Sequence, residues 1–281
     1  MRVVAPGKVV LLGEYAVLDG APAVVAAVDH GVVVTFTPGP IRAVVTPVDD
    51  RFARAALDAV GAPAGTYVFA DWNPVPGPDK VGLGGSAAAT VAAVLVGAPG
   101  LDPHTRFRTA LAVHRAVQGS GSGVDVAAST YGGVCRFEAE QVTPAPPVAP
   151  SVVYSGQPAR TGPRVEAYLA WRERSAFVAE SRALVDQFGA DPVGALRAAG
   201  RALRRMADRA GLAYWTDGID GVVRLAEAHG GAAKPSGAGG GDIVVALFDA
   251  PEGRLAFEEA ARAGGYRVVP CAVAPGAAVA G

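Results

Sequence analysis

The stretch "KVGLGGSAAA", residues 80–89, joins a glycine-rich loop directly to an alanine-rich helical pattern. Glycines lack side chains, so successive backbone N–H groups can converge on one anion, and the N-terminus of the following helix adds the positive end of its dipole. The stretch therefore predicts a phosphate site. Ser86 falls in the first turn of the expected helix, where its hydroxyl either faces a phosphate or Mg²⁺ or serves as a plain helix cap.

Two other glycine-bearing segments share this character: "PGKVVLLGEY", residues 6–15, and "KPSGAGGGD", residues 234–242. Each exposes main-chain amides, carries a lysine and adjoins an apolar pattern. We name residues 6–15 the first loop, residues 80–89 the second loop and residues 234–242 the third loop. Together they predict one polyphosphate site, held by main-chain amides and lysines.

Other nucleotide and nucleophile motifs match less well. Gly82, Gly84 and Ala87 fit the G-x-G-x-x-A fingerprint of dinucleotide-binding folds, but the fingerprint should follow a buried strand and here follows the proline-rich "NPVPGPDK". No GxxxxGK[ST] loop occurs, and "GGSAA" lacks the last glycine of a nucleophile elbow. The residues alone therefore favour a phosphate-binding loop over an oxidoreductase, a P-loop protein or a hydrolase.

Composition restricts the class of protein. The chain has 281 residues, of which 51% are hydrophobic and 18% charged, which is typical of a folded globular protein of one or two domains. A net charge of −1 argues against nucleic-acid or membrane-surface binding. Cys135 and Cys271 form no metal or disulfide pattern, and neither a signal-peptide pattern nor an apolar stretch of about 20 residues is visible. We expect a cytoplasmic protein without a nucleic-acid or membrane partner.

The order of patterns predicts the fold class. Strand patterns dominate the first 37 residues, helical patterns begin at Gly85, and the second half mixes both without strict alternation of strand and helix. That mixture predicts an α+β fold rather than one doubly wound sheet. The proline-rich "QVTPAPPVAP", residues 141–150, is the best candidate linker. We therefore predict two lobes, spanning residues 1–145 and 146–281.

All three loops, in this order, resemble the motifs of the GHMP kinase superfamily. Within it, "HRAVQGSGSGVDVAASTYGG", residues 114–133, and "YSGQPARTGPRVEAYL", residues 154–169, are most similar to phosphomevalonate kinases. Three positions depart from the family patterns: Gly85 and Arg160 stand where serines are usual, and His114 stands where mevalonate kinases carry a magnesium-binding glutamate.

The resemblance implies a two-lobed α+β fold, with an N-terminal lobe like ribosomal protein S5 and a ferredoxin-like C-terminal lobe. It implies an ATP- and Mg²⁺-dependent kinase that transfers the γ-phosphoryl group to the phosphate of (R)-5-phosphomevalonate, giving the 5-diphosphate. A mevalonate kinase or another GHMP kinase is the alternative, and a non-catalytic ligand sensor on the same fold is the third. A monomer or homodimer is expected.

The resemblance also implies roles for individual residues. Lys8 and Asp125 are expected to be catalytic, with Asp125 orienting Lys8, because a phosphate acceptor with a second pKa of about 6 is mostly deprotonated already. ATP is expected to contact Lys80, Gly82, Leu83, Gly84, Gly85, Ser86 and Ala87, with Ser86 on Mg²⁺. The acceptor is expected to contact Glu14, Tyr15, Ser122, Arg160, Ser236, Gly237, Ala238, Gly239 and Gly240, with Arg136, His114 and Arg115 as further cationic candidates.

Overall fold

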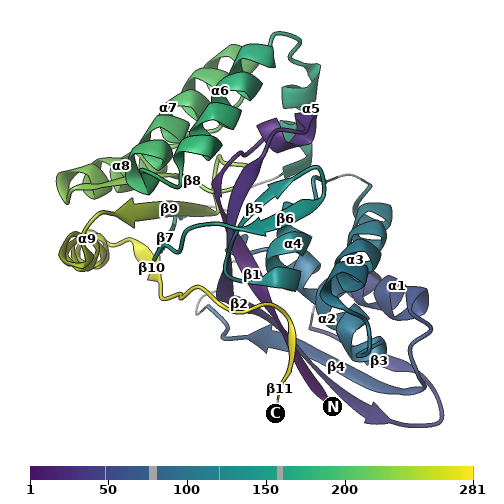
Figure 1. Cartoon of the computed structure of the whole chain (residues 1–281). Coiled ribbons are helices and arrows are strands. Elements are labelled where there is room, and N and C mark those ends of the chain that lie inside the picture. Colours follow the sequence, from purple (N-terminus) through teal and green to yellow (C-terminus); the bar gives the residue numbers. More distant parts are fainter. Residues whose placement is uncertain (48, 76–80, 120, 157–160, 281) are drawn as a thin grey trace.

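The computed structural model describes residues 1–281 except 48, 76–80, 120, 157–160 and 281. Two sheets with helices packed against them make up the described chain (Figure 1). The first sheet has the order β11-β1-β2-β4-β3, with β5 paired to β2 and β6 paired to β5. Its strands are β1 (Arg2–Leu12), β2 (Ala23–Pro38), β3 (Ala43–Val45), β4 (Gly65–Trp72), β5 (Val134–Glu138), β6 (Gln141–Pro144) and β11 (Ala278–Ala280).

The valine-rich strand β1 is the central element of the molecule. Side chains alternate between the two faces of a strand, so Val10 packs with the helices of the first sheet while Val9 and Leu11 pack with the helices of the second sheet. Pro6 and Gly7 are turn-forming residue types, yet both lie inside this strand. The strand continues through this point with a shift in its pairing to β2, because Pro6 and Gly7 lie at a bulge.

Four α-helices belong to the first sheet. The helix α2 is apolar on all sides, which is typical of a buried helix, and it packs against β1, β2, α1 and α3. Asp102 caps the helix that begins at Pro103, since its carboxylate accepts hydrogen bonds from the backbone N–H groups of His104 and Thr105. The helices are α1 (Arg51–Ala59), α2 (Gly85–Gly97), α3 (Pro103–Gln118) and α4 (Val124–Tyr131).

The second sheet is antiparallel, with the order β10-β7-β9-β8. Its strands are β7 (Ser151–Tyr154), β8 (Gly231–Pro235), β9 (Ile243–Phe248) and β10 (Arg267–Val269). The helices of this half are α5 (Thr161–Ala170), α6 (Ser175–Gln187), α7 (Pro192–Ala210), α8 (Asp217–Ala228) and α9 (Pro251–Ala263). The helix α6 also packs on the short helix η1 (Ala16–Asp19) that follows β1, so the two halves share a core.

The α+β class expected from the sequence is confirmed. The strand β6 ends at Pro144 in the first sheet and β7 begins at Ser151 in the second, while β11 returns from the C-terminal end to pair with β1. The division into lobes at residue 145 stays a prediction. No helix in the described part of the chain is long and apolar enough to cross a membrane.

Candidate active site

The first and second loops lie against each other along β1. The backbone N–H of Lys8 donates to the carbonyl oxygen of Leu83 at 2.8 Å, and Lys8 Nζ donates to the carbonyl oxygen of Gly82 at 3.3 Å. A Cβ atom added to Gly7 would lie 2.4 Å from the same Leu83 oxygen. Gly7 is therefore required for close approach of the two backbones.

The third loop closes on the same place. A Cβ atom added to Gly237 would lie 3.9 Å from Lys8 Nζ, and one added to Gly82 would lie 2.6 Å from a carboxylate oxygen of Asp242. The three segments that the sequence singled out thus meet around the end of the Lys8 side chain. Glycines from both halves of the chain thus lie beside one ammonium group, as expected for a polyphosphate site.

The two residues predicted to be catalytic form an ion pair. Lys8 Nζ lies 3.7 Å from Asp125 Oδ2, and the side chains are 9% and 35% exposed. Asp125 occupies the first turn of α4, which begins after Gly123 in a left-handed conformation (φ +95°). The structure therefore brings together two groups 117 positions apart in sequence, with the lysine shielded and the carboxylate partly open to solvent.

The N-terminus of α2 opens into a groove. Gly84 precedes the helix with φ +82°, and residues 82–86 of the second loop line a cavity of about 540 Å³. Aromatic and apolar residues form much of the remaining wall, including Phe52, Phe69, Trp72, Pro74 and Val75. Of the predicted ATP contacts, Ala87 is a buried residue of the first turn of α2, and Lys80 lies outside the described residues. A groove of this size beside a helix N-terminus suits a nucleotide, with its base on the apolar wall.

Several residues predicted to bind the acceptor also connect the third loop to the first. The backbone N–H of Val10 donates to Ser236 Oγ at 2.8 Å, and the Tyr15 hydroxyl donates to the carbonyl oxygen of Ala238 at 2.7 Å. Glu14 is ion-paired with the fully buried Lys234. The sequence suggested that the lysine of each loop binds phosphate. Lys234 does not, because its Nζ points into the core. Direct contacts of Glu14 and Tyr15 with an acceptor stay predictions.

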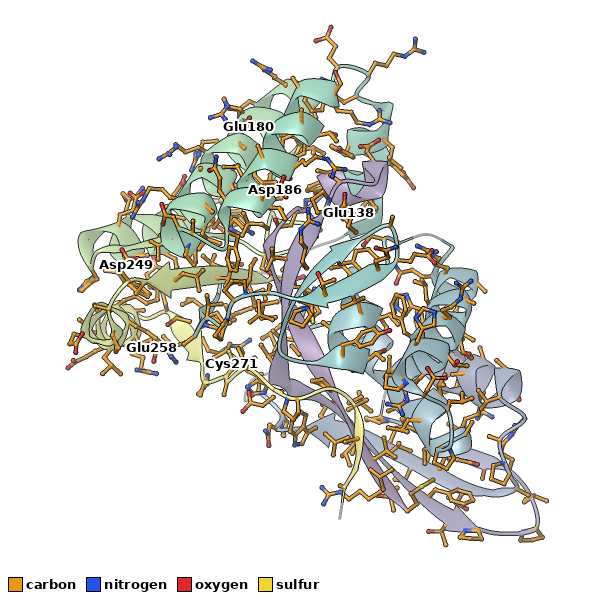
Figure 2. The ribbon with its side chains drawn as sticks, viewed as in Figure 1. Glu138, Glu180, Asp186, Asp249, Glu258 and Cys271 are labelled. Carbon is orange, nitrogen blue, oxygen red and sulfur yellow. The ribbon has the colours of Figure 1, made fainter. Side chains whose placement is uncertain are left out.

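The two arginines among the further cationic candidates form ion pairs with acidic side chains. Arg115 pairs with Glu140 at 2.6 Å and donates to the carbonyl oxygen of Ser122, so it holds the loop that leads to Asp125. Arg136 on β5 pairs with Asp186 on α6 at 2.8 Å and thereby links the two halves. Figure 2 labels Asp186 of α6 and Glu138 of β5, which also pairs with Arg136. Both arginine side chains therefore have structural roles. Arg160, the first candidate, lies outside the described residues.

Sequence reasoning missed Arg164. In α5, Arg164 donates to the carbonyl oxygens of Ala213 and Gly240, each at 3.4 Å, and a Cβ atom added to Gly240 would lie 2.1 Å from Arg164 Nη2. Its guanidinium group therefore lies directly on the third loop. The available signal was its place within "YSGQPARTGPRVEAYL", residues 154–169, a stretch already found similar to phosphomevalonate kinases.

Two family models match the chain. The model described as the GHMP kinases N terminal domain matches residues 54–133, and the model described as GHMP kinases C terminal matches residues 184–266. A phosphomevalonate kinase from Streptomyces sp. (strain CL190) is 32% identical, covering 89% of this chain and 90% of the relative. The chain belongs to the GHMP kinases.

Other GHMP kinases are also similar to this one. A mevalonate kinase from Archaeoglobus fulgidus is 30% identical, covering 90% of this chain and 95% of the relative. Among solved structures, the phosphomevalonate kinase of Streptococcus pneumoniae in complex with phosphomevalonate and AMPPNP has a TM-score of 0.84 at 16% identity, covering 98% of this chain and 100% of that one. The two-lobed GHMP kinase fold expected from the sequence is thus confirmed.

As a GHMP kinase the chain uses ATP, whereas the Mg²⁺ expected from the sequence stays a prediction. Ser86 Oγ lies 3.2 Å from His114 Nε2, and the charge of Asp125 opposes the lowering of the His114 pKa by burial. No group of three or more acidic, histidine or cysteine residues suited to a metal was found among the described residues. That is compatible with Mg²⁺, which is usually held by one or two carboxylates together with substrate phosphates and water.

Replacing His114 by Asn is expected to reduce the loss of stability in acid. Burial lowers the pKa of His114 from its ordinary value of about 6.5, and the charge of Asp125 only partly opposes that shift. Between the lowered pKa and about 6.5 the unfolded chain binds more protons than the folded one, so the free energy of unfolding falls as the pH drops through this window. Urea unfolding at neutral and mildly acidic pH measures the effect. An equal loss of unfolding free energy in the wild type and in His114→Asn would contradict this prediction.

Proposed function

We propose that this GHMP kinase transfers the γ-phosphoryl group of ATP to the phosphate of (R)-5-phosphomevalonate. The observation that carries the proposal is the position of Lys8, whose Nζ lies beside Asp125 and next to glycines of the second and third loops. Phosphoryl transfer depends on positioning and charge neutralisation more than on covalent help from the protein. The three converging loops supply both.

Each part of the site has a separate task in this mechanism. The N-terminal amides of α2 hold the triphosphate, and its base occupies the groove of about 540 Å³ beside them. Lys8 neutralises the charge that develops on the transferred group, and Asp125 holds Lys8 in place. The bare amides of the third loop face the acceptor. Mg²⁺ bound to the phosphates and to Ser86 would neutralise further negative charge.

The choice of a phosphate acceptor rests on two observations. The relative at 32% identity is a phosphomevalonate kinase, and Arg164 brings a guanidinium group to the third loop. Guanidinium suits a phosphate, which it binds through two parallel hydrogen bonds. Mevalonate is the second candidate acceptor, because a relative at 30% identity is a mevalonate kinase. A cytoplasmic location and a monomeric or homodimeric state remain proposals from the sequence.

One assay tests this proposal. ADP release with Mg²⁺ATP is measured separately with 5-phosphomevalonate, mevalonate, galactose and homoserine, and the product is identified by mass. We expect turnover with 5-phosphomevalonate and formation of its 5-diphosphate. Turnover with mevalonate alone would replace the proposal by a mevalonate kinase. Tight ATP binding without turnover of any acceptor would favour the ligand sensor.

Replacing Arg164 by Ala is expected to raise the KM for 5-phosphomevalonate about tenfold, since a hydrogen bond to a charged group contributes about 1.5–3 kcal/mol and 1.4 kcal/mol is tenfold in affinity. The KM for ATP should change less than twofold, because Arg164 lies on the third loop and not in the nucleotide groove. Arg172→Ala, at an exposed position just beyond the same helix, is the matched control. An unchanged acceptor KM in Arg164→Ala would show that this residue does not bind the acceptor.

A further inference from the structure

The ion pair between Glu14 and Lys234 lies in the core and outside the phosphate site. The two residues are 220 positions apart in sequence, and their side chains are 3% and 0% exposed. Glu14 follows β1 of the first sheet, whereas Lys234 belongs to β8 of the second. The pair therefore joins the two halves of the molecule at the start of the third loop.

The ammonium group of Lys234 has its three donors engaged. Besides Glu14, Lys234 Nζ donates to the carbonyl oxygen of Pro235 at 3.0 Å and to that of Val10 at 3.5 Å. Burial lowers the pKa of Lys234, and the charge of Glu14 opposes this shift. A lysine with three acceptors and no solvent contact has one orientation, so the backbone that carries it is fixed relative to Glu14 and Val10.

The attachment is continued along the third loop at alternate positions. Lys234 contacts Glu14, Ser236 Oγ accepts from Val10, and Ala238 accepts from Tyr15. The intervening Gly237 lies beside Lys8. One side of this segment is thus bound to the first loop, which leaves the glycine side to face the reacting phosphates.

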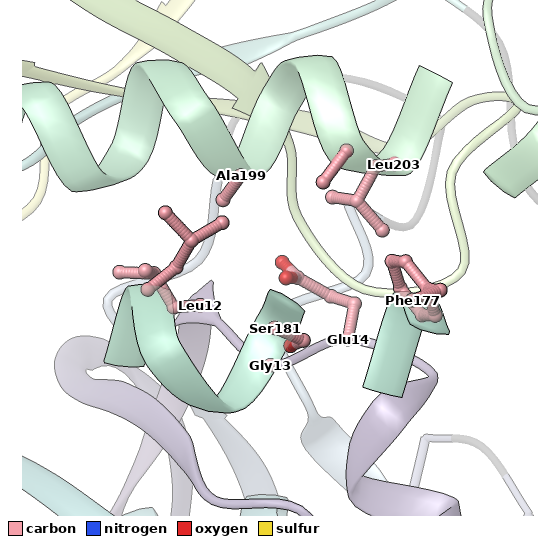
Figure 3. A pocket seen from close by; sticks show the side chains of 9 residues that line it. Leu12, Gly13, Glu14, Phe177, Ser181, Ala199 and Leu203 are labelled. Atoms are coloured by element: carbon pink, nitrogen blue, oxygen red, sulfur yellow. The ribbon is translucent and has the colours of Figure 1, made fainter. Parts of the chain in front are cut away.

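The second carboxylate oxygen of Glu14 has no hydrogen-bond donor among the described residues. Glu14 Oε2 is buried and accepts no hydrogen bond from any described group. The residue lines a small cavity of about 10 Å³, together with Gly13, Ser181 of α6 and Leu203 of α7, and Figure 3 shows the Glu14 side chain among these neighbours. Such a volume has room for about one water molecule. Among the described residues, Lys234 is thus the only side chain that orients the carboxylate.

We propose that Glu14 and Lys234 are positioning residues, whose ion pair sets the third loop at the distance from Lys8 that phosphoryl transfer requires. Stability does not explain such a pair, because replacing a buried ion pair by apolar residues of similar size is often neutral or stabilising. A fixed geometry between two halves of a site does explain it. The inference rests on the proposed function, since it assigns the third loop to the reacting phosphates.

The test compares single variants with an apolar pair. Glu14→Leu and Lys234→Met are each expected to lower the Tm by about 10 °C, because each leaves one charge buried and unpaired. The double variant Glu14→Leu/Lys234→Met removes both charges and should recover most of that loss. Its kcat should still fall about tenfold, with the KM for ATP changed less than twofold. The surface pair of Arg205 and Glu180 gives the matched control, Arg205→Met/Glu180→Leu, with no change expected.

A second variant and a second measurement keep the test decisive. Glu14→Asp retains both charges but withdraws the carboxylate by one methylene, so it should fold and also lose kcat. Hydrogen exchange at residues 236–241 without any substrate should be faster in Glu14→Leu/Lys234→Met and in Glu14→Asp than in the wild type. This readout needs no acceptor, so it separates failure of the positioning role from failure of the proposed function. Wild-type kcat or wild-type exchange in the folded variants would overturn the inference.

Discussion

Replacing Lys8 by Met is expected to lower kcat by about 10²–10³-fold, the loss typical when one donor to transition-state charge is removed. The Lys8 side chain is 9% exposed and its backbone is held in β1, so an apolar side chain of similar length should leave the fold intact. The substitution removes the positive charge at the point where the three loops meet. Steady-state ADP release, with circular dichroism to confirm folding, measures the effect.

Asp125→Asn is the informative comparison for Lys8→Met. A phosphate acceptor with a second pKa of about 6 needs no general base at neutral pH, so the role left to Asp125 is to hold Lys8, whose Nζ lies 3.7 Å from its carboxylate. Asparagine keeps an oxygen in that place, and we expect measurable activity to remain, with a loss of about tenfold. Equal losses in the two variants would mean that Asp125 removes a proton, as an alcohol acceptor would require.

Local patterns predicted the parts of the site that depend on backbone chemistry. The glycines of the second and third loops and the buried apolar helix α2 follow from short stretches of sequence, whereas Asp125 was found only through the resemblance to GHMP kinases. Each of these features is set by conformational freedom or by helix periodicity within about 15 residues. They could therefore be located before the fold was known.

Contacts between distant side chains could not be predicted in the same way. Glu14 and Lys234 belong to two motifs that both suggested ligand contacts, and only the packing of β1 against the second half shows that they bind each other. The pairing of β11 with β1 was missed for the same reason, since a three-residue strand has no periodicity to detect. Arg136 looked available in sequence, but Asp186 on another element pairs with it.

Adjacent glycines at the start of α2 allow a sharp test of the nucleotide site. Gly84 has φ +82°, and a Cβ atom there would lie 2.9 Å from Cγ of Lys8. Gly85 has no positive φ, and a Cβ atom there would meet nothing within 4 Å. Alanine at position 84 is therefore strained in its backbone and also displaces the lysine, whereas alanine at position 85 should be tolerated.

Gly84→Ala is expected to lower kcat/KM for ATP by about 10²-fold, because a displacement of about 1 Å in a positioned group can cost that much. Gly85→Ala should change it less than threefold, as should Gly85→Ser, which restores the residue usual in the family. All three substitutions fall on the same loop and add one or two heavy atoms, so they differ mainly in backbone conformation and in the contact with Lys8. If Gly84→Ala and Gly85→Ala behaved alike, the site would not depend on the close approach of the second loop to Lys8. A loss confined to Gly84→Ala would instead show that nucleotide use depends on glycine at position 84, where no larger residue fits.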